Sequence, residues 1–217
     1  MRKPLLPALG LCGIFALSPH AYAASCSSFA DSSGNFIITQ DCTGTVTATQ
    51  SGASLLNSAT LAGGVFAGNG IRFDVTNASG GIIRRSALTP NFAVELRGGG
   101  ALTNSGTIGD GLTGIDSNGK VLIITSLSSP GVLTNNLGST ILGGAALSGD
   151  AATVVNRGTI SYNIAGASGV GVVLSGANAS LINSGLIVSG PVTSYGVTSG
   201  DFGGANYTNE SGGRIEG

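Results

Sequence analysis

The chain has 217 residues, of which 38 are glycine and 9% are charged, and its net charge is −1 at pH 7. Because 41% of the residues are hydrophobic, the composition differs from that of disordered chains, which are poor in apolar residues. Glycine has no three-residue period, which excludes collagen. The charge is too low for a basic surface that binds duplex nucleic acid. The length suits one domain or one elongated module.

Residues 1–23 have the layout of a secretory signal peptide. Two basic residues, Arg2 and Lys3, precede an apolar run, which is followed by the small-residue tripeptide Ala21-Tyr22-Ala23. An uncleaved membrane anchor would need about 20 apolar residues, more than this run contains. We therefore expect export of the protein, with cleavage after Ala23.

Cleavage would leave a chain without histidine, in which seven basic side chains face ten acidic ones. Two cysteines without histidine cannot complete a Cys/His zinc site. A Ser-His-Asp or Cys-His nucleophile system is excluded for the same reason. The sequence thus predicts no metal site, no cofactor and no catalytic residue that can be named.

The two cysteines of the mature chain, Cys26 and Cys42, are the only candidates for a crosslink. Exported proteins meet an oxidising compartment, in which pairing is the default. A reactive redox pair is the alternative, but the sequence lacks the Cys-x-x-Cys spacing typical of it. We expect a disulfide that clamps an N-terminal cap formed by residues 24–50, ahead of repeats in residues 51–217.

One sequence motif recurs along the chain in a constant order. Its short form, apolar-x-Asn-x-Gly-x-Ile, occupies residues 102–108, 154–160 and 181–187. A longer form, Asn-x-x-Gly-x-x-Ile, occurs three more times, so that six asparagines mark the repeat: Asn77, Asn104, Asn135, Asn156, Asn183 and Asn209. A recurring order of this kind is the signature of a repeat architecture.

The segments that precede the motifs alternate between apolar and polar residues, as in Ile71–Val75 and Phe92–Leu96. This period of two predicts strands with one face inside and one outside. The segment Val121–Ile124 differs, because it is apolar on both faces. We expect no helix, since glycine interrupts every window of useful length.

The parity of the motif places its asparagine on the same inward face as the leucine and isoleucine around it. An unpaired amide there would cost a few kcal/mol. Stacked coils lie about 4.8 Å apart, a spacing at which equivalent asparagines can form a hydrogen-bonded ladder. We expect the glycine that follows to adopt a positive φ and to turn the chain toward the next strand.

These patterns predict an all-β protein, a right-handed parallel β-helix of roughly six to seven coils. Each coil would share a continuous core with its neighbours, and the irregular motif spacing would reflect loops of different length. An antiparallel sandwich, with Asn-x-Gly at hairpin turns, is the rival fold. That rival gives no reason for the apolar-Asn-Gly-Ile order to recur.

The signal peptide, the glycine-rich and cysteine-poor chain and the serial motifs resemble the passenger domains of bacterial autotransporters (type V secretion). The resemblance covers roughly residues 70–217. It implies a β-helical stem, displayed at the cell surface or released, that passes the periplasm and crosses the outer membrane through a C-terminal β-barrel. The sequence stops at Gly217 without the alternating strands of a barrel. We therefore interpret this chain as the N-terminal part of a longer passenger.

Three functions are compatible with this interpretation. The first is an adhesive stalk or interaction module without catalysis, whose partner would be a host-cell or matrix protein, a glycan or another copy of the chain. The second is a β-helical lyase or hydrolase of polysaccharides, although no acidic residues recur at equivalent repeat positions. The third is a spacer for an effector elsewhere in a longer protein.

A few side chains outside the motif could contact a ligand. The adjacent pair Arg84-Arg85 could meet an anionic glycan, but a solvated loop pair is the simpler interpretation. Tyr162, Tyr195 and Tyr207 could stack on sugars, although we expect them to be scattered surface or edge residues. We interpret the Asn-x-Ser/Thr sequons as ordinary polar residues of repeats and loops, not as glycosylation sites. The sequence singles out no residue as a binding residue.

Overall fold

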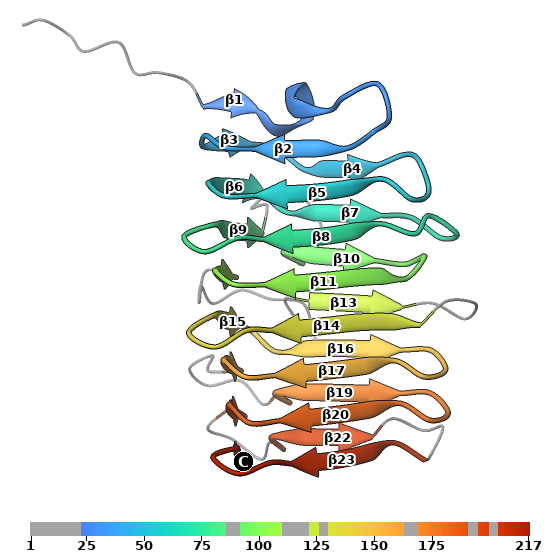
Figure 1. Cartoon of the computed structure of the whole chain (residues 1–217), viewed down its shortest axis with the longest axis vertical. Coiled ribbons are helices and arrows are strands. Elements are labelled where there is room, and N and C mark those ends of the chain that lie inside the picture. The colour runs from blue at the N-terminus through green and yellow to red at the C-terminus, as the bar shows by residue number, and fades with distance from the viewer. Residues whose placement is uncertain are drawn as a thin grey trace, which may run out of the picture.

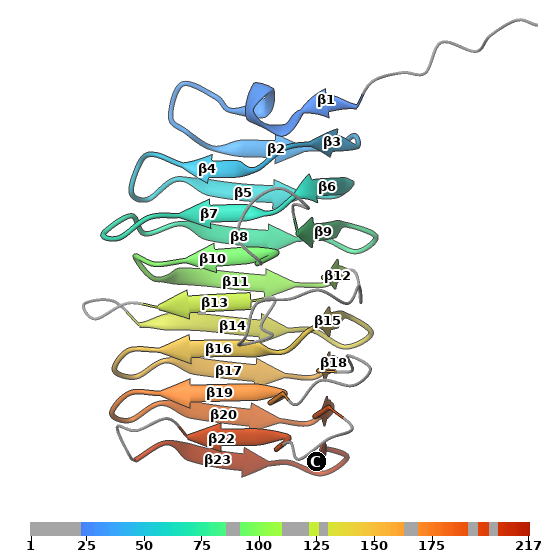
Figure 2. The same cartoon turned by 180° about the vertical axis from the view of Figure 1, so that it is seen from behind.

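The protein is a right-handed parallel β-helix, in which the chain winds through a stack of similar coils from the N-terminal to the C-terminal end (Figure 1). The computed structural model describes residues 23–85, 92–109, 122–125, 130–162, 169–190, 195–199 and 204–217. Three sheets run along the stack, and neighbouring strands within each sheet are parallel. The view from behind shows the same layers (Figure 2). The predicted fold is thus confirmed.

Each complete coil gives one strand to each of the three sheets, which we call A, B and C. Sheet B is built, in order, from β2 (Phe36–Ile38), β5 (Ser54–Asn57), β8 (Asp74–Asn77), β11 (Gly100–Asn104), β14 (Gly131–Asn135), β17 (Thr153–Asn156), β20 (Ser180–Asn183) and β23 (Asn206–Asn209). Sheet A contains β1 (Ala24–Ser25), β3 (Cys42–Thr43), β6 (Thr60–Gly63), β9 (Ile82–Arg85), β12 (Thr107–Ile108), β15 (Thr140–Leu142), β18 (Thr159–Ser161), β21 (Leu186–Val188) and β24 (Arg214–Glu216). Sheet C contains β4 (Val46–Ala48), β7 (Val65–Ala67), β10 (Val94–Leu96), β13 (Leu122–Thr125), β16 (Ala145–Ser148), β19 (Val172–Ser175) and β22 (Val197–Ser199).

Sheet C has seven strands among the described residues, so seven coils contribute to all three sheets there. The first of these coils consists of β2, β3 and β4. They lie within residues 24–50, the segment expected to form a cap, and they already belong to the three sheets. The part of that segment outside the coils holds β1 and a 3₁₀ helix, η1 (Cys26–Phe29).

The register between coils brings like residues together inside the helix. Asn156 pairs with Asn183 and Val154 with Leu181 in sheet B, while Ile160 pairs with Ile187 in sheet A. The isoleucine column of sheet A is continuous with equivalent apolar residues along the stack: Cys42, Leu61, Ile83, Ile108, Ile141, Ile160, Ile187 and Ile215. Alternating strands bury one face only, so stacking such coils produces one shared apolar core.

The glycine of the motif has two different roles, and the prediction of a positive φ is correct for only one of them. In the longer form, glycine does adopt a left-handed conformation, as at Gly80 (φ 80°) and Gly138 (φ 79°). In the short form it does not, and a Cβ at Gly106 would instead lie 2.1 Å from the carbonyl oxygen of Gly81. The short form needs glycine because adjacent coils approach too closely for a side chain.

The N-terminal end of the stack is closed by the predicted disulfide. Cys26, on η1, is bonded to Cys42, with a Cα–Cα distance of 5.0 Å and a sequence separation of 16 residues. Both cysteines are buried in the core cluster. Since Cys42 occupies the place of isoleucine in the sheet A column, the disulfide joins η1 directly to the end of the core.

Candidate functional site: a groove at one corner of the stack

The asparagines predicted to form a ladder do so, and each donates from Nδ2 to Oδ1 of the next. The N···O distances are 2.8 Å from Asn77 to Asn104, 2.9 Å from Asn104 to Asn135, 2.8 Å from Asn135 to Asn156, 2.7 Å from Asn156 to Asn183, and 2.8 Å from Asn183 to Asn209. The side chains of all but Asn209 are fully buried. Their amides are therefore part of the core and are closed to a ligand.

Sequence reasoning missed one member of this ladder, Asn57. Its Nδ2 donates to Asn77 Oδ1 at 2.8 Å, and its side chain is fully buried. The motif around it reads Asn57-x-Ala59-x-Leu61, with alanine for glycine and leucine for isoleucine. A search that tolerated these two replacements would have found it. One coil earlier, Ile38 pairs with Asn57 and ends the ladder.

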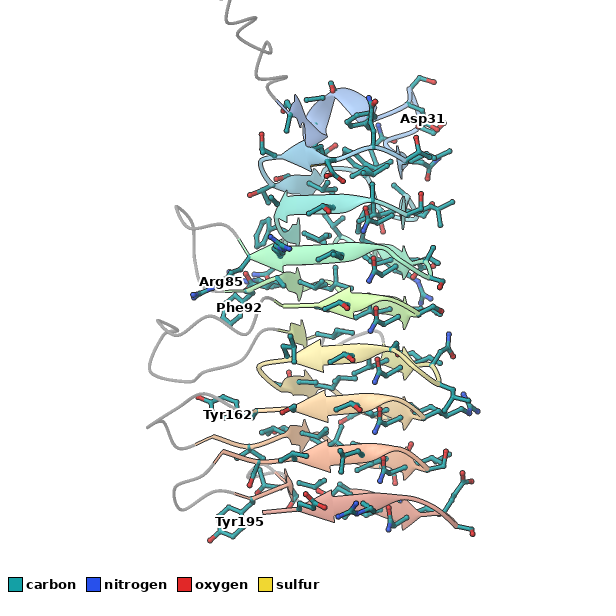
Figure 3. All side chains as sticks on the ribbon, turned by 90° about the vertical axis from the view of Figure 1, so that its left-hand side faces the viewer. Asp31, Arg85, Phe92, Tyr162 and Tyr195 are labelled. Carbon is teal, nitrogen blue, oxygen red and sulfur yellow. A yellow bond between two sulfur atoms is a disulfide. The ribbon has the colours of Figure 1, made fainter. Side chains whose placement is uncertain are left out.

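At the corner where the chain passes from sheet A to sheet C lie three aromatic side chains that differ in exposure: Tyr195 is exposed, Phe92 is partly exposed and Tyr162 is buried. The connections that cross this corner differ in length: β15 ends at Leu142 and β16 begins at Ala145, whereas β9 ends at Arg85 and β10 begins at Val94. Arg85, Phe92, Tyr162 and Tyr195 lie along this edge of the stack (Figure 3). We call this edge the A–C corner.

A groove of about 280 Å³ lies beside the A–C corner, over the outer face of β4, β7 and β10. Its lining consists of Thr45, Thr47, Gly63, Val65, Phe66, Phe92 and Glu95. The register explains this grouping, because Thr47, Phe66 and Glu95 are consecutive members of one outward-facing column of sheet C. We call this the A–C groove.

Glu95 is the one charged side chain among the buried polar residues described, with 6% of its surface exposed. The Arg97 guanidinium balances it, since Arg97 Nε donates to Glu95 Oε1 at 2.6 Å. The same guanidinium lies over the Phe66 ring, 5.6 Å from its centroid, which is a cation–π geometry. The alternation of Phe92–Leu96 correctly predicted that Glu95 faces outward, but not that it would be buried there.

Several of the other described carboxylates are bound to backbone amides. Asp74 Oδ1 accepts from Ala101 N at 2.8 Å, and Asp150 Oδ1 from Ala177 N at 3.1 Å, in each case joining neighbouring coils. Asp41 Oδ1 accepts likewise from Thr60 N at 2.9 Å. At the N-terminal end, Asp31 accepts from two backbone amides of its own turn. These hydrogen bonds give the four carboxylates a structural role.

Of the three tyrosines expected at scattered surface or edge positions, Tyr195 and Tyr207 are exposed and only Tyr162 differs. Tyr195 and Tyr207 are exposed to 69% and 44%, but Tyr162 is only 3% exposed. A Cβ at Gly169 would lie 2.0 Å from the Tyr162 ring, so this ring packs directly against the glycine backbone. Tyr162 is thus part of the packing at the A–C corner and offers no platform for a sugar.

Neither a metal centre nor a membrane span emerges from the described residues. They include no cluster of three or more His, Cys, Asp or Glu side chains that could hold a metal ion. No helix in the described parts of the chain is long and apolar enough to cross a membrane. The chain matches no family model, and comparison with curated proteins and with solved structures finds no significant similarity.

Proposed function

We propose that this chain is an exported β-helical interaction module, displayed at the cell surface or released, that adheres to its partner and performs no catalysis. The observation that carries the proposal is the division of the molecule into a uniform stem and a varied corner. The asparagine ladder runs without interruption from Asn57 to Asn209. Connections of different length, the exposed Tyr195, the partly exposed Phe92 and a groove gather at the A–C corner.

This division suits adhesion, because a stem of regularly stacked coils holds a binding corner in a fixed geometry. The uniform core tolerates long and short connections at the corner, since each coil contacts only its neighbours. Binding residues are commonly found on connections that a rigid scaffold positions. The signal-peptide layout of residues 1–23 and the resemblance to autotransporter passengers agree with export.

Purified protein, collected after export, should bind to immobilised epithelial cells or extracellular matrix in a saturable manner. Heat-denatured protein is the control for nonspecific adsorption. Binding should survive addition of a chelator, because the mature chain lacks the histidines of a zinc site. Absence of saturable binding to any cell or matrix surface would contradict an adhesive role and would favour a spacer.

A polysaccharide-processing enzyme is the second candidate, and the observation that favours it is the buried carboxylate of Glu95 in the A–C groove. Glycoside hydrolysis uses two carboxyl groups about 5–9.5 Å apart. Among the described residues that line the groove, Glu95 supplies one, and it is paired with Arg97. Release of reducing ends from a polysaccharide by the pure protein would establish this function instead of adhesion.

A further inference from the structure

The A–C groove has the wall composition of a small-ligand site. Its volume of about 280 Å³ is close to the lower end of the range for small-molecule pockets, about 300 Å³. Two aromatic rings, Phe66 and Phe92, contribute apolar surface, and both are partly exposed. Such pockets are mostly apolar and contain a small number of polar groups that fix the orientation of a ligand. Here these groups are Glu95 and two threonines.

The polar groups of the groove are held in place by the fold. Thr45 Oγ1 donates to the carbonyl oxygen of Gly63 at 2.8 Å, which leaves its lone pairs as acceptors. A Cβ at Gly63 would lie 2.3 Å from the backbone of Gly44, so this wall has to be bare backbone. Glu95 is anchored through Oε1 by Arg97, while the carboxylate can accept further hydrogen bonds at Oε2.

The charge of the groove narrows the chemistry of its ligand. A cation would compete with Arg97 for a carboxylate that is already balanced. An anion would be repelled by the Glu95 carboxylate, and the Arg97 guanidinium that could attract it is already paired with that carboxylate and stacked over Phe66. A wholly apolar ligand would cover the remaining exposed surface of Glu95 without offering its carboxylate a hydrogen bond, which is costly. A neutral ligand with several hydroxyl groups meets none of these penalties.

We propose that the A–C groove binds one unit of a neutral saccharide, an inference that rests on the proposed adhesive function and specifies its ligand. The C–H groups of a sugar ring carry partial positive charge and suit the negative face of an aromatic ring such as Phe92. Its hydroxyl groups donate to the Glu95 carboxylate, which forms stronger hydrogen bonds than a neutral acceptor. Thr47, exposed at the rim, adds a hydroxyl that both donates and accepts.

Saturation-transfer NMR on the exported protein tests this directly. The probes are the methyl glycosides of glucose, galactose, mannose and N-acetylglucosamine, with N-acetylneuraminate as the anionic comparator and Nα-acetyl-lysine amide as the cationic one. We expect saturation transfer to at least one neutral glycoside, stronger than to either charged comparator. Transfer to none of the four, or stronger transfer to a charged comparator, would overturn the proposal.

Variants then assign binding to the groove. Phe92→Ala, Thr47→Val and Glu95→Gln should each raise the Kd of the best glycoside, at least tenfold for Phe92→Ala and Glu95→Gln. Tyr195→Ala, an exposed aromatic at the same corner that does not line the groove, and Thr208→Val on β23 are the matched controls and should leave Kd unchanged. Thr47 is exposed, so its variant remains informative if Glu95→Gln fails to fold. Equal affinity of the folded groove variants and the controls would refute the site.

The cell-binding experiment separates this proposal from the proposed function. If the groove variants bind cells as strongly as the parent protein, adhesion stands and the groove is not its site. If the glycoside binds and the variants weaken it, but no cell or matrix surface is bound, the saccharide site stands and the adhesive role fails.

Discussion

Replacing Asn156 by alanine tests the asparagine ladder, because this residue lies in the middle of the stack. Its Oδ1 accepts from Asn135 Nδ2 at 2.8 Å. Its Nδ2 donates to Asn183 Oδ1 at 2.7 Å and to the Leu186 carbonyl oxygen at 3.2 Å. Asn156→Ala therefore removes one partner from buried groups on both neighbouring coils.

The size of the effect follows from what each neighbour retains. Asn135 Nδ2 keeps its hydrogen bond to the Thr159 carbonyl oxygen at 3.2 Å, whereas Asn183 Oδ1 loses the Asn156 donor. A buried polar group that loses its partner costs about 1–3 kcal/mol, so the one oxygen left without a donor lowers the free energy of unfolding by about that amount. Ser184→Ala, on the outward side of the next coil, should cost less than about 0.5 kcal/mol.

Urea denaturation followed by circular dichroism and by tyrosine fluorescence measures these changes. Coincident transitions by the two probes are required before free energies are compared, because long repeat arrays can lose cooperativity. In a double-mutant cycle, Asn156→Ala and Asn183→Ala should couple by about 0.5–3 kcal/mol, since the two side chains share a hydrogen bond. Additive effects of the two substitutions would refute the ladder as a source of stability.

Three further predictions concern the disulfide, the glycines and Asp31. Replacing Cys26 and Cys42 by serine should destabilise the N-terminal end by about 3 kcal/mol, the chain-entropy value for a loop near 15 residues, and should increase hydrogen exchange in residues 24–43 more than in residues 130–160; equal exchange in both regions would contradict a local clamp. Gly106→Ala should lower the urea midpoint more than Gly138→Ala, because a Cβ at Gly106 would overlap the Gly81 carbonyl oxygen whereas a Cβ at Gly138 meets nothing within 4 Å; the reverse order would show that backbone conformation outweighs close packing. The pKa of Asp31 is lowered, chiefly by the hydrogen bond from the backbone amide of Asn35. The ionised Asp31 side chain therefore stabilises the fold fully above the ordinary Asp pKa of about 3.9, and this stabilisation is lost as the pH falls through the lower pKa of the folded state. An NMR titration that gave Asp31 an ordinary or raised pKa in the folded protein would contradict this.

The repeat could be read from the sequence because the fold uses the same chemistry at every coil. A strand with period two must bury one face, and an asparagine on that face needs a partner. The most economical partner is the same residue one coil away. The order of Leu102, Asn104 and Ile108 thus contained the parity, the ladder and the stacking direction. The disulfide followed from the same local reasoning, because Cys26 and Cys42 are the only cysteines outside residues 1–23.

Other features depended on contacts between coils that no local pattern records. Gly106 is needed because its backbone lies close to that of Gly81 on the preceding coil. A single copy of the motif contains no information about this distance between coils. Asn57 escaped notice because its coil tolerates Ala59 and Leu61 at positions where the other copies have glycine and isoleucine. The burial of Tyr162 depends on Gly169, which is distant from it in sequence but lies in the same coil, before β19.

The sequence by itself determined the class of fold and the inward face of the repeated strands that carry the asparagine motif, because these follow from residue type and periodicity. Only the tertiary structure placed Thr47, Phe66 and Glu95 in one column of sheet C, and only it brought Phe92 beside them. These residues lie on three different coils, and the connections between the coils differ in length. Their alignment is set by the hydrogen-bond register between parallel strands, which exists only when the coils have stacked.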